Sequence, residues 1–87
     1  MLERFEFTPA AEREFEKLEH NLQKRITEKL NFYLASRQPL YFAKPLVDLR
    51  PATHRFRIGS YRVLFYVSGK VMVVTLIDKR EDAYRRK

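Results

Sequence analysis

The chain has 87 residues, with 18 Lys plus Arg against 11 Asp plus Glu and a formal net charge of +7. This length predicts one small domain over residues 1–87 and excludes a two-domain enzyme. Apolar residues make up 45% of the chain, too many for a disordered protein. No Cys and only two His are present, and no apolar run could span a membrane. We therefore expect a cytoplasmic protein with no metal, no cofactor and no membrane partner.

The first half predicts a strand and two helices. Phe5 and Phe7 flank a polar residue, which is typical of a short strand. Thr8 and Pro9 suit the cap and the first position of a helix. A break is expected at His20–Asn21. A second helix follows, marked by apolar residues at helical spacing: Leu22, Ile26, Leu30, Tyr33 and Leu34. The two helices form an αα-hairpin with one apolar seam.

The second half predicts an irregular loop and an antiparallel meander. Three prolines forbid a regular element over residues 38–53, although the loop's apolar residues indicate that it packs on something. Three strands follow, over His54–Ile58, Tyr61–Val67 and Lys70–Asp78, joined by turns at Gly59-Ser60 and Ser68-Gly69. Residues 81–87 complete an α+β fold as a short C-terminal helix.

Two-residue turns fix which residues share a face of this meander. They place Arg57 opposite Arg62, Arg62 opposite Thr75, and Val63 opposite Val74. The face expected to carry the helices is apolar: Phe56, Ile58, Tyr61, Val63, Phe65, Val67, Met72, Val74 and Leu76. The other face holds three arginines and an apolar patch without a helix cover: Arg55, Arg57, Arg62, Leu64, Tyr66, Val71, Val73, Thr75 and Ile77. Such a patch usually marks a protein partner.

The arginine cluster is the most informative feature of the sequence. Like charges on opposed strand positions destabilise a sheet, so stability alone does not explain Arg57 beside Arg62 with Arg55 nearby. Guanidinium groups match phosphate oxygens in pairs, which favours a phosphodiester ligand. The alternative is a structural pairing with Asp48 or a C-terminal acid. Residues 45–87 hold 10 basic and 4 acidic groups, so a polyanion is expected to dock there.

Four segments in order resemble the RelE/ParE toxin superfamily. They are a strand-to-helix entry at Phe7–Leu18 (FTPAAEREFEKL), a loop at Ala43–Leu46 (AKPL), a basic hairpin at His54–Val67 (HRFRIGSYRVLFYV), and a terminal basic motif at Lys79–Arg85 (KREDAYR). The resemblance implies a RelE-like toxin of a type II toxin–antitoxin pair. In that superfamily the RelE branch cleaves mRNA on the ribosome without metal. The ParE branch instead poisons DNA gyrase and lacks the catalytic basic set.

The resemblance also implies roles for particular residues. The catalytic set would be Arg55, Arg57, Arg62, Lys79, Arg80 and Tyr84, and the RNA-binding set Lys44, Arg50 and Arg85. The best-known members carry Lys where this chain has Arg55 and Arg57. Because arginine keeps its proton, these two suit binding and charge stabilisation better than proton abstraction.

Several alternatives remain for this site. Lys79 is expected to follow the arginines in phase, as general base or as a solvated strand-end lysine. Tyr84 either stacks on a base or packs the terminal helix. The expected partners are mRNA, the ribosome and an acidic antitoxin. Two other functions are a gyrase inhibitor and a plain RNA-binding module, and the second is disfavoured because no exposed aromatic stacking pair is evident.

Overall fold

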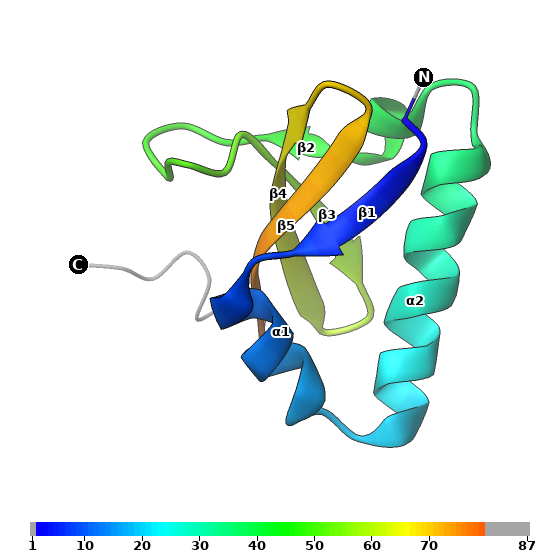
Figure 1. Cartoon of the computed structure of the whole chain (residues 1–87), viewed down its shortest axis with the longest axis vertical. Coiled ribbons are helices and arrows are strands. Elements are labelled where there is room, and N and C mark those ends of the chain that lie inside the picture. Colours follow the sequence, from blue (N-terminus) through cyan, green and yellow to red (C-terminus); the bar gives the residue numbers. More distant parts are fainter. Residues whose placement is uncertain (1, 80–87) are drawn as a thin grey trace.

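The computed structural model describes residues 2–79, and Met1 and residues 80–87 lie outside this range. Its elements in chain order are β1 (Arg4–Phe7), α1 (Pro9–Glu16), α2 (His20–Ala35), the 3-10 helix η1 (Pro39–Phe42), β2 (Lys44–Pro45), β3 (His54–Ile58), β4 (Tyr61–Ser68) and β5 (Val71–Lys79) (Figure 1). The α+β class is confirmed, and the helix expected over residues 81–87 lies outside the described residues. Neither α1 nor α2 is long and apolar enough to cross a membrane.

The sheet is larger than the expected meander and is mixed. Its five strands within the described range lie in the order β1-β5-β4-β3-β2. β1 runs parallel to β5, with Phe7 opposite Val74, whereas the other neighbours are antiparallel. The edges are therefore β1, from the start of the chain, and the two-residue strand β2. The β1–β5 pairing joins segments distant in sequence, and the β2–β3 pairing closes an irregular loop, so local patterns reveal neither.

Side-chain hydrogen bonds stabilise the start of α1 and the junction between α1 and α2. Thr8 caps α1, its Oγ1 accepting a 3.2 Å hydrogen bond from the amide of Ala11. Gln23 of α2 donates from Nε2 to the carbonyls of Phe15 (2.9 Å) and Leu18 (3.2 Å), which ties the first turn of α2 to the end of α1. The interruption consequently falls at residues 17–19, slightly before the predicted break at His20–Asn21.

One face of the sheet packs against α1 and α2 and forms the main core. Its stacked rings run from Tyr33 to Phe56, with centroids 4.1 Å apart, and from Phe56 to Phe65, 4.7 Å apart. The buried side chains come from both helices and three strands: Ala11, Ile26, Leu30, Tyr33, Phe56, Ile58, Val63, Phe65, Met72, Val74 and Ile77. The predicted helix seam and most of the predicted core face are therefore confirmed.

The register of the first hairpin is as predicted, but that of the second is not. Arg57 lies opposite Arg62, and Ile58 opposite Tyr61 across a two-residue turn that contains Gly59 at φ +61°. The second turn is Gly69-Lys70 instead of Ser68-Gly69, because the residue at φ +61° is again the first of the turn.

A β-bulge in β5 then reverses the alternation of the strand. Phe65 is opposite Val74, but Leu64 is opposite Leu76, so Thr75 is the extra residue. After the bulge each side chain lies on the face opposite to the predicted one. Leu76 therefore leaves the helix face and Ile77 joins the main core. Both predicted placements were wrong for this reason.

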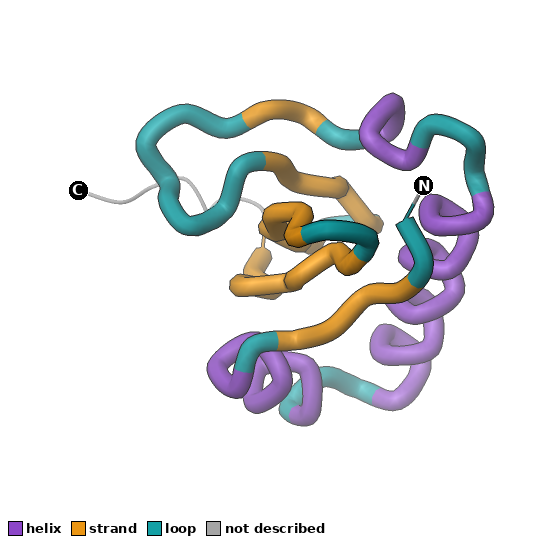
Figure 2. The backbone as a smooth tube through the Cα atoms, turned by 45° about the horizontal axis from the view of Figure 1, so that its top comes forward, coloured by secondary structure: helices purple, strands orange, loops and turns teal. Residues whose placement is uncertain are grey.

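The loop of residues 46–53 covers part of the other face. Leu64 and Ala52 are buried there, with Leu46, Leu49 and Leu76 packed around them. Hydrogen bonds from Leu46 N to Thr53 O and from Thr53 N to Phe65 O, both 2.9 Å, anchor the loop ends. Figure 2 shows this loop, between β2 and β3, extending away from both helices. The apolar patch predicted to be uncovered is thus reduced to half-buried Tyr66, Val71 and Val73.

Candidate functional site

The basic residues of β2, β3 and β4 form two rows across the helix-free face. Phe56, Ile58 and Val63 are buried under the helices, so their strand neighbours Arg55, Arg57 and Arg62 face the other way. The first row pairs Arg57 with Arg62. The second row pairs Lys44 of β2 with Arg55. We call the face carrying these four residues the basic face.

The three arginines differ in exposure, and two of them repel each other. Arg57 is exposed, Arg55 is half-buried, and Arg62 retains only 9% of its accessible surface. Desolvation of Arg55, followed by the positive charge of Arg57, lowers the pKa of Arg55. The hairpin thus holds like charges close together at an electrostatic cost.

Asp78 joins the first row, which sequence analysis did not predict. The bulge at Thr75 moves Asp78 to the position opposite Arg62, where Thr75 was expected. The predicted pairing of Arg62 with Thr75 was therefore wrong. The Oδ1 atom of Asp78 accepts a 2.8 Å hydrogen bond from the amide of Lys79. The first row therefore ends in an anion, with Asp78 beside Arg62. The positive charge available to a phosphate comes mainly from Arg55, Arg57 and Lys44.

Lys79 does not lie on the basic face. It is opposite Tyr61, whose ring packs against the main core on the helix side. The expectation that Lys79 follows the arginines in phase was wrong, because the bulge inverts the face of every residue after Thr75. The role of Lys79 as general base was predicted from its position beside Arg57 and Arg62, and Lys79 lies on the opposite face from both.

Of the other predicted residues, Lys44 and Arg50 are described. Lys44 is exposed opposite Arg55, within the second row. Arg50 belongs to the 46–53 loop and lines a cavity of about 290 Å³ between that loop, β4 and β5. Arg80, Tyr84 and Arg85 lie outside the described residues, so their predicted roles stay predictions. The cavity itself was missed, because nothing in the sequence indicated which face the loop would cover.

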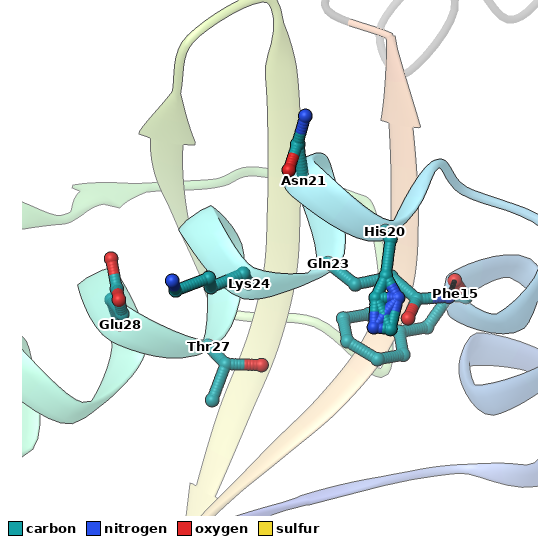
Figure 3. Close-up of a pocket in the computed structure, with 7 residues that line it drawn as sticks. All are labelled: Phe15, His20, Asn21, Gln23, Lys24, Thr27 and Glu28. Carbon is teal, nitrogen blue, oxygen red and sulfur yellow. Dashed lines mark hydrogen bonds between the residues drawn. The ribbon is translucent and has the colours of Figure 1, made fainter.

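A second hollow, of about 550 Å³, lies between the end of α1 and the first turns of α2 (Figure 3). Its lining mixes one ring with neutral and oppositely charged groups: Phe15, His20, Asn21, Gln23, Lys24, Thr27 and Glu28. The side-chain amide of Gln23 is already hydrogen-bonded to the end of α1. The positive charge of Lys24 and the negative charge of Glu28 leave the lining without net charge from these two residues. This groove follows from how the αα-hairpin is joined, and none of the predicted site residues lies in it.

Exposed aromatic rings occur where α2 is followed by η1. Phe32 keeps 56% and Tyr41 79% of their accessible surface, and both contact Phe42, with centroids 5.7 and 5.5 Å away. These exposed rings do not form the stacking pair whose absence was expected, because Phe32 is tilted by 58° and Tyr41 by 88° to the ring of Phe42. Because Phe42 also stacks on buried Tyr33 at 5.1 Å, these rings extend the main core to the surface.

Comparisons with known proteins agree with this architecture. Residues 5–84 match a family model described as ParE toxin of type II toxin-antitoxin system, parDE. Toxin RelG of Mycobacterium tuberculosis is 34% identical over 82 residues, which cover 92% of this chain and 93% of that protein.

Solved structures show the same fold. The RelBE2 toxin–antitoxin complex of Mycobacterium tuberculosis contains a chain that is 29% identical, with a TM-score of 0.74 over 92% of this chain and 100% of the other. In the archaeal RelE-RelB complex of Pyrococcus horikoshii, the similar chain is 20% identical, with a TM-score of 0.70 over 99% of this chain and 100% of its own length. At that identity the likeness concerns the fold alone.

Proposed function

The chain belongs to the RelE/ParE superfamily of toxins of type II toxin–antitoxin systems, and we propose that it is an endoribonuclease of the RelE type that cuts mRNA on the ribosome. The observation that carries the proposal is the basic face. Arg57 and Arg62 lie on opposed positions of adjacent strands, with Arg55 and Lys44 in the next row. A surface of this kind suits a ligand with successive phosphates.

RNA supplies its own nucleophile, so the protein needs mainly to position and stabilise. The 2′-oxygen attacks the adjacent phosphorus, the bond to the 5′-oxygen breaks, and negative charge accumulates on the phosphoryl oxygens. Guanidinium groups held on a sheet are preorganised donors for that charge. Buried Arg62 is held in place by its surroundings, whereas exposed Arg57 is accessible to the RNA. Arginine keeps its proton, so in this step water accepts the 2′-proton and protonates the departing 5′-oxygen.

The proposal is tested with Arg57→Ala, because Arg57 is exposed and its loss leaves the core intact. Loss of one preorganised donor is expected to lower the cleavage rate by about two to three orders of magnitude. The matched control is Arg13→Ala, which removes the same charge from an exposed position on α1. Cleavage is mapped by sequencing message ends from purified translating ribosomes. Equal cleavage by both variants would contradict the role of the basic face.

Inhibition of DNA gyrase is the second candidate function, favoured by the description of the matching family model. The carboxylate of Asp78 opposite Arg62 also fits it, because that acid reduces the positive charge available for a phosphate. Supercoiling by purified gyrase, assayed beside the ribosome reaction, separates the two. Blocked supercoiling with intact messages would replace the ribonuclease proposal with this one.

We further propose an acidic antitoxin as the partner of the basic face. The supporting observations are the net charge of +7 and the like-charge repulsion between Arg55 and Arg57, which an acidic segment would relieve. The similar chains in the solved complexes named above also occur with antitoxins. Hydrogen exchange of the complex is expected to protect residues 44–64. Protection confined to α1 and α2 would place the partner on the other side of the molecule.

A further inference from the structure

The cavity under the 46–53 loop combines apolar walls with polar groups at its rim. Apolar lining comes from both the loop and the sheet: Leu49, Pro51, Ala52, Leu64 and Leu76. Asp48 and Arg50 supply a carboxylate and a guanidinium, and the hydroxyl of Thr75 donates to the carbonyl of Leu64 at 3.4 Å, so it meets a ligand as an acceptor. Its volume of about 290 Å³ is at the small end for ligand cavities, which suits one planar ring system rather than a whole nucleotide.

The cavity lies next to the two basic rows. Leu64, in its wall, is opposite Arg55 on one side and opposite Leu76 on the other. Arg62 is two residues before Leu64 on the same strand and face, a displacement of about 7 Å along the strand. A polyanion bound across Arg57 and Arg55 therefore passes the mouth of an apolar cavity within the reach of one nucleotide.

We propose that this cavity binds a single unstacked nucleobase of the RNA beside the bound phosphates, and this inference rests on the proposed ribonuclease function. Leucine and proline walls accommodate the faces of the ring, and the rim groups meet its polar edge. The carboxylate of Asp48 only accepts hydrogen bonds. The donor of uracil, N3–H, lies between two carbonyl oxygens that repel a carboxylate, so Asp48 favours the bases with an exocyclic amino group: adenine, cytosine and guanine.

The backbone at Asp48 makes a clean test available. Asp48 has φ +62°, a left-handed conformation that Asp and Asn adopt more readily than other residues with side chains. Asp48→Asn therefore keeps the loop conformation while replacing one acceptor oxygen by a donor amide. The matched control is Glu28→Gln, which makes the same change of charge in the separate groove on α2.

The experiment titrates methyl-labelled protein with the four ribonucleoside 5′-monophosphates, followed by the NMR signals of Leu49, Leu64 and Leu76. These methyl groups are expected to shift, and the affinity for AMP, CMP and GMP to exceed that for UMP about tenfold. Asp48→Asn should remove most of this discrimination, whereas Glu28→Gln should preserve it. Ribose 5-phosphate, the probe without a base, should leave the three methyl signals in place.

Two results would overturn the inference: equal affinity for all four nucleotides, or equal shifts with ribose 5-phosphate. Message cleavage is measured separately, so the two proposals fail in different ways. Nucleotide discrimination with intact messages would retain the cavity as a base site and remove the ribonuclease activity. If the cleavage positions are the same in Asp48→Asn and the four nucleotides bind equally well, the ribonuclease activity is retained and the base site is excluded.

Discussion

The two faces of the sheet contrast in what covers them. The helix face is apolar along three strands, and α1 and α2 bury it in one continuous core. The other face carries basic side chains on β2, β3 and β4, with a small second cluster of Ala52 and Leu64 under the 46–53 loop. One face therefore supplies the stability that allows the other to hold like charges together and to keep a cavity.

Truncation at the centre of the helix face should have the largest effect. Phe56 is fully buried and stacks on both Tyr33 and Phe65. Phe56→Ala is expected to lower the free energy of unfolding by about 3–5 kcal/mol, since it removes a ring from a tightly packed core. Urea unfolding followed by circular dichroism measures this loss. A smaller loss of unfolding free energy than in Leu64→Ala would show that the helix face is not the more stabilising of the two faces.

Truncation of the second cluster should cost less. Leu64 retains 3% of its accessible surface, but only the 46–53 loop covers it. Leu64→Ala is expected to cost about 2 kcal/mol, the lower end for such changes, because a loop can settle into the space. Limited proteolysis should then cut the loop earlier than in the unmodified protein. Unchanged proteolysis with a loss as large as that of Phe56→Ala would show that the clusters form one unit.

An intermediate test concerns the polar contact that joins α1 to the sheet. Glu14 Oε1 accepts a 2.9 Å hydrogen bond from the amide of Ile77, just beyond the bulge. Glu14→Ala leaves that amide without its acceptor and is expected to cost about 1 kcal/mol. Hydrogen exchange at Ile77 should accelerate more than at Val63 on the neighbouring strand. Equal acceleration at both amides would indicate general destabilisation instead.

The smallest effect is expected on the basic face, and with the opposite sign. Arg57→Gln removes a positive charge that lies opposite Arg62. The same charge contributes to lowering the pKa of Arg55. The guanidiniums are protonated at neutral pH, so removing the repulsion should stabilise the fold by a few tenths of a kcal/mol. The gain in melting temperature should shrink as salt screens the charges. A loss of stability would show that Arg57 has a structural role.

Sequence patterns predicted the site only as far as the first hairpin. Gly59 and strict alternation set the Arg57–Arg62 pairing, which the structure confirms. The bulge at Thr75 has no comparable signal, because Thr is an ordinary strand residue and apolar residues occur on both sides of it. Lys79 was consequently assigned to the wrong face, and the place of Asp78 beside Arg62 was not predicted. A parallel partner for β5 depends on contacts across the whole chain, beyond the range of such patterns.

The short first strand has a further consequence for solubility. β1 ends at Phe7, opposite Val74, so β5 continues to Lys79 with no strand from residues 2–79 beside its outer edge. An open edge of that kind is a template for pairing with another molecule. Helix α1 turns back along this part of β5, and Glu14 occupies the amide of Ile77 (Figure 1). The helix thereby protects the chain against edge-to-edge aggregation.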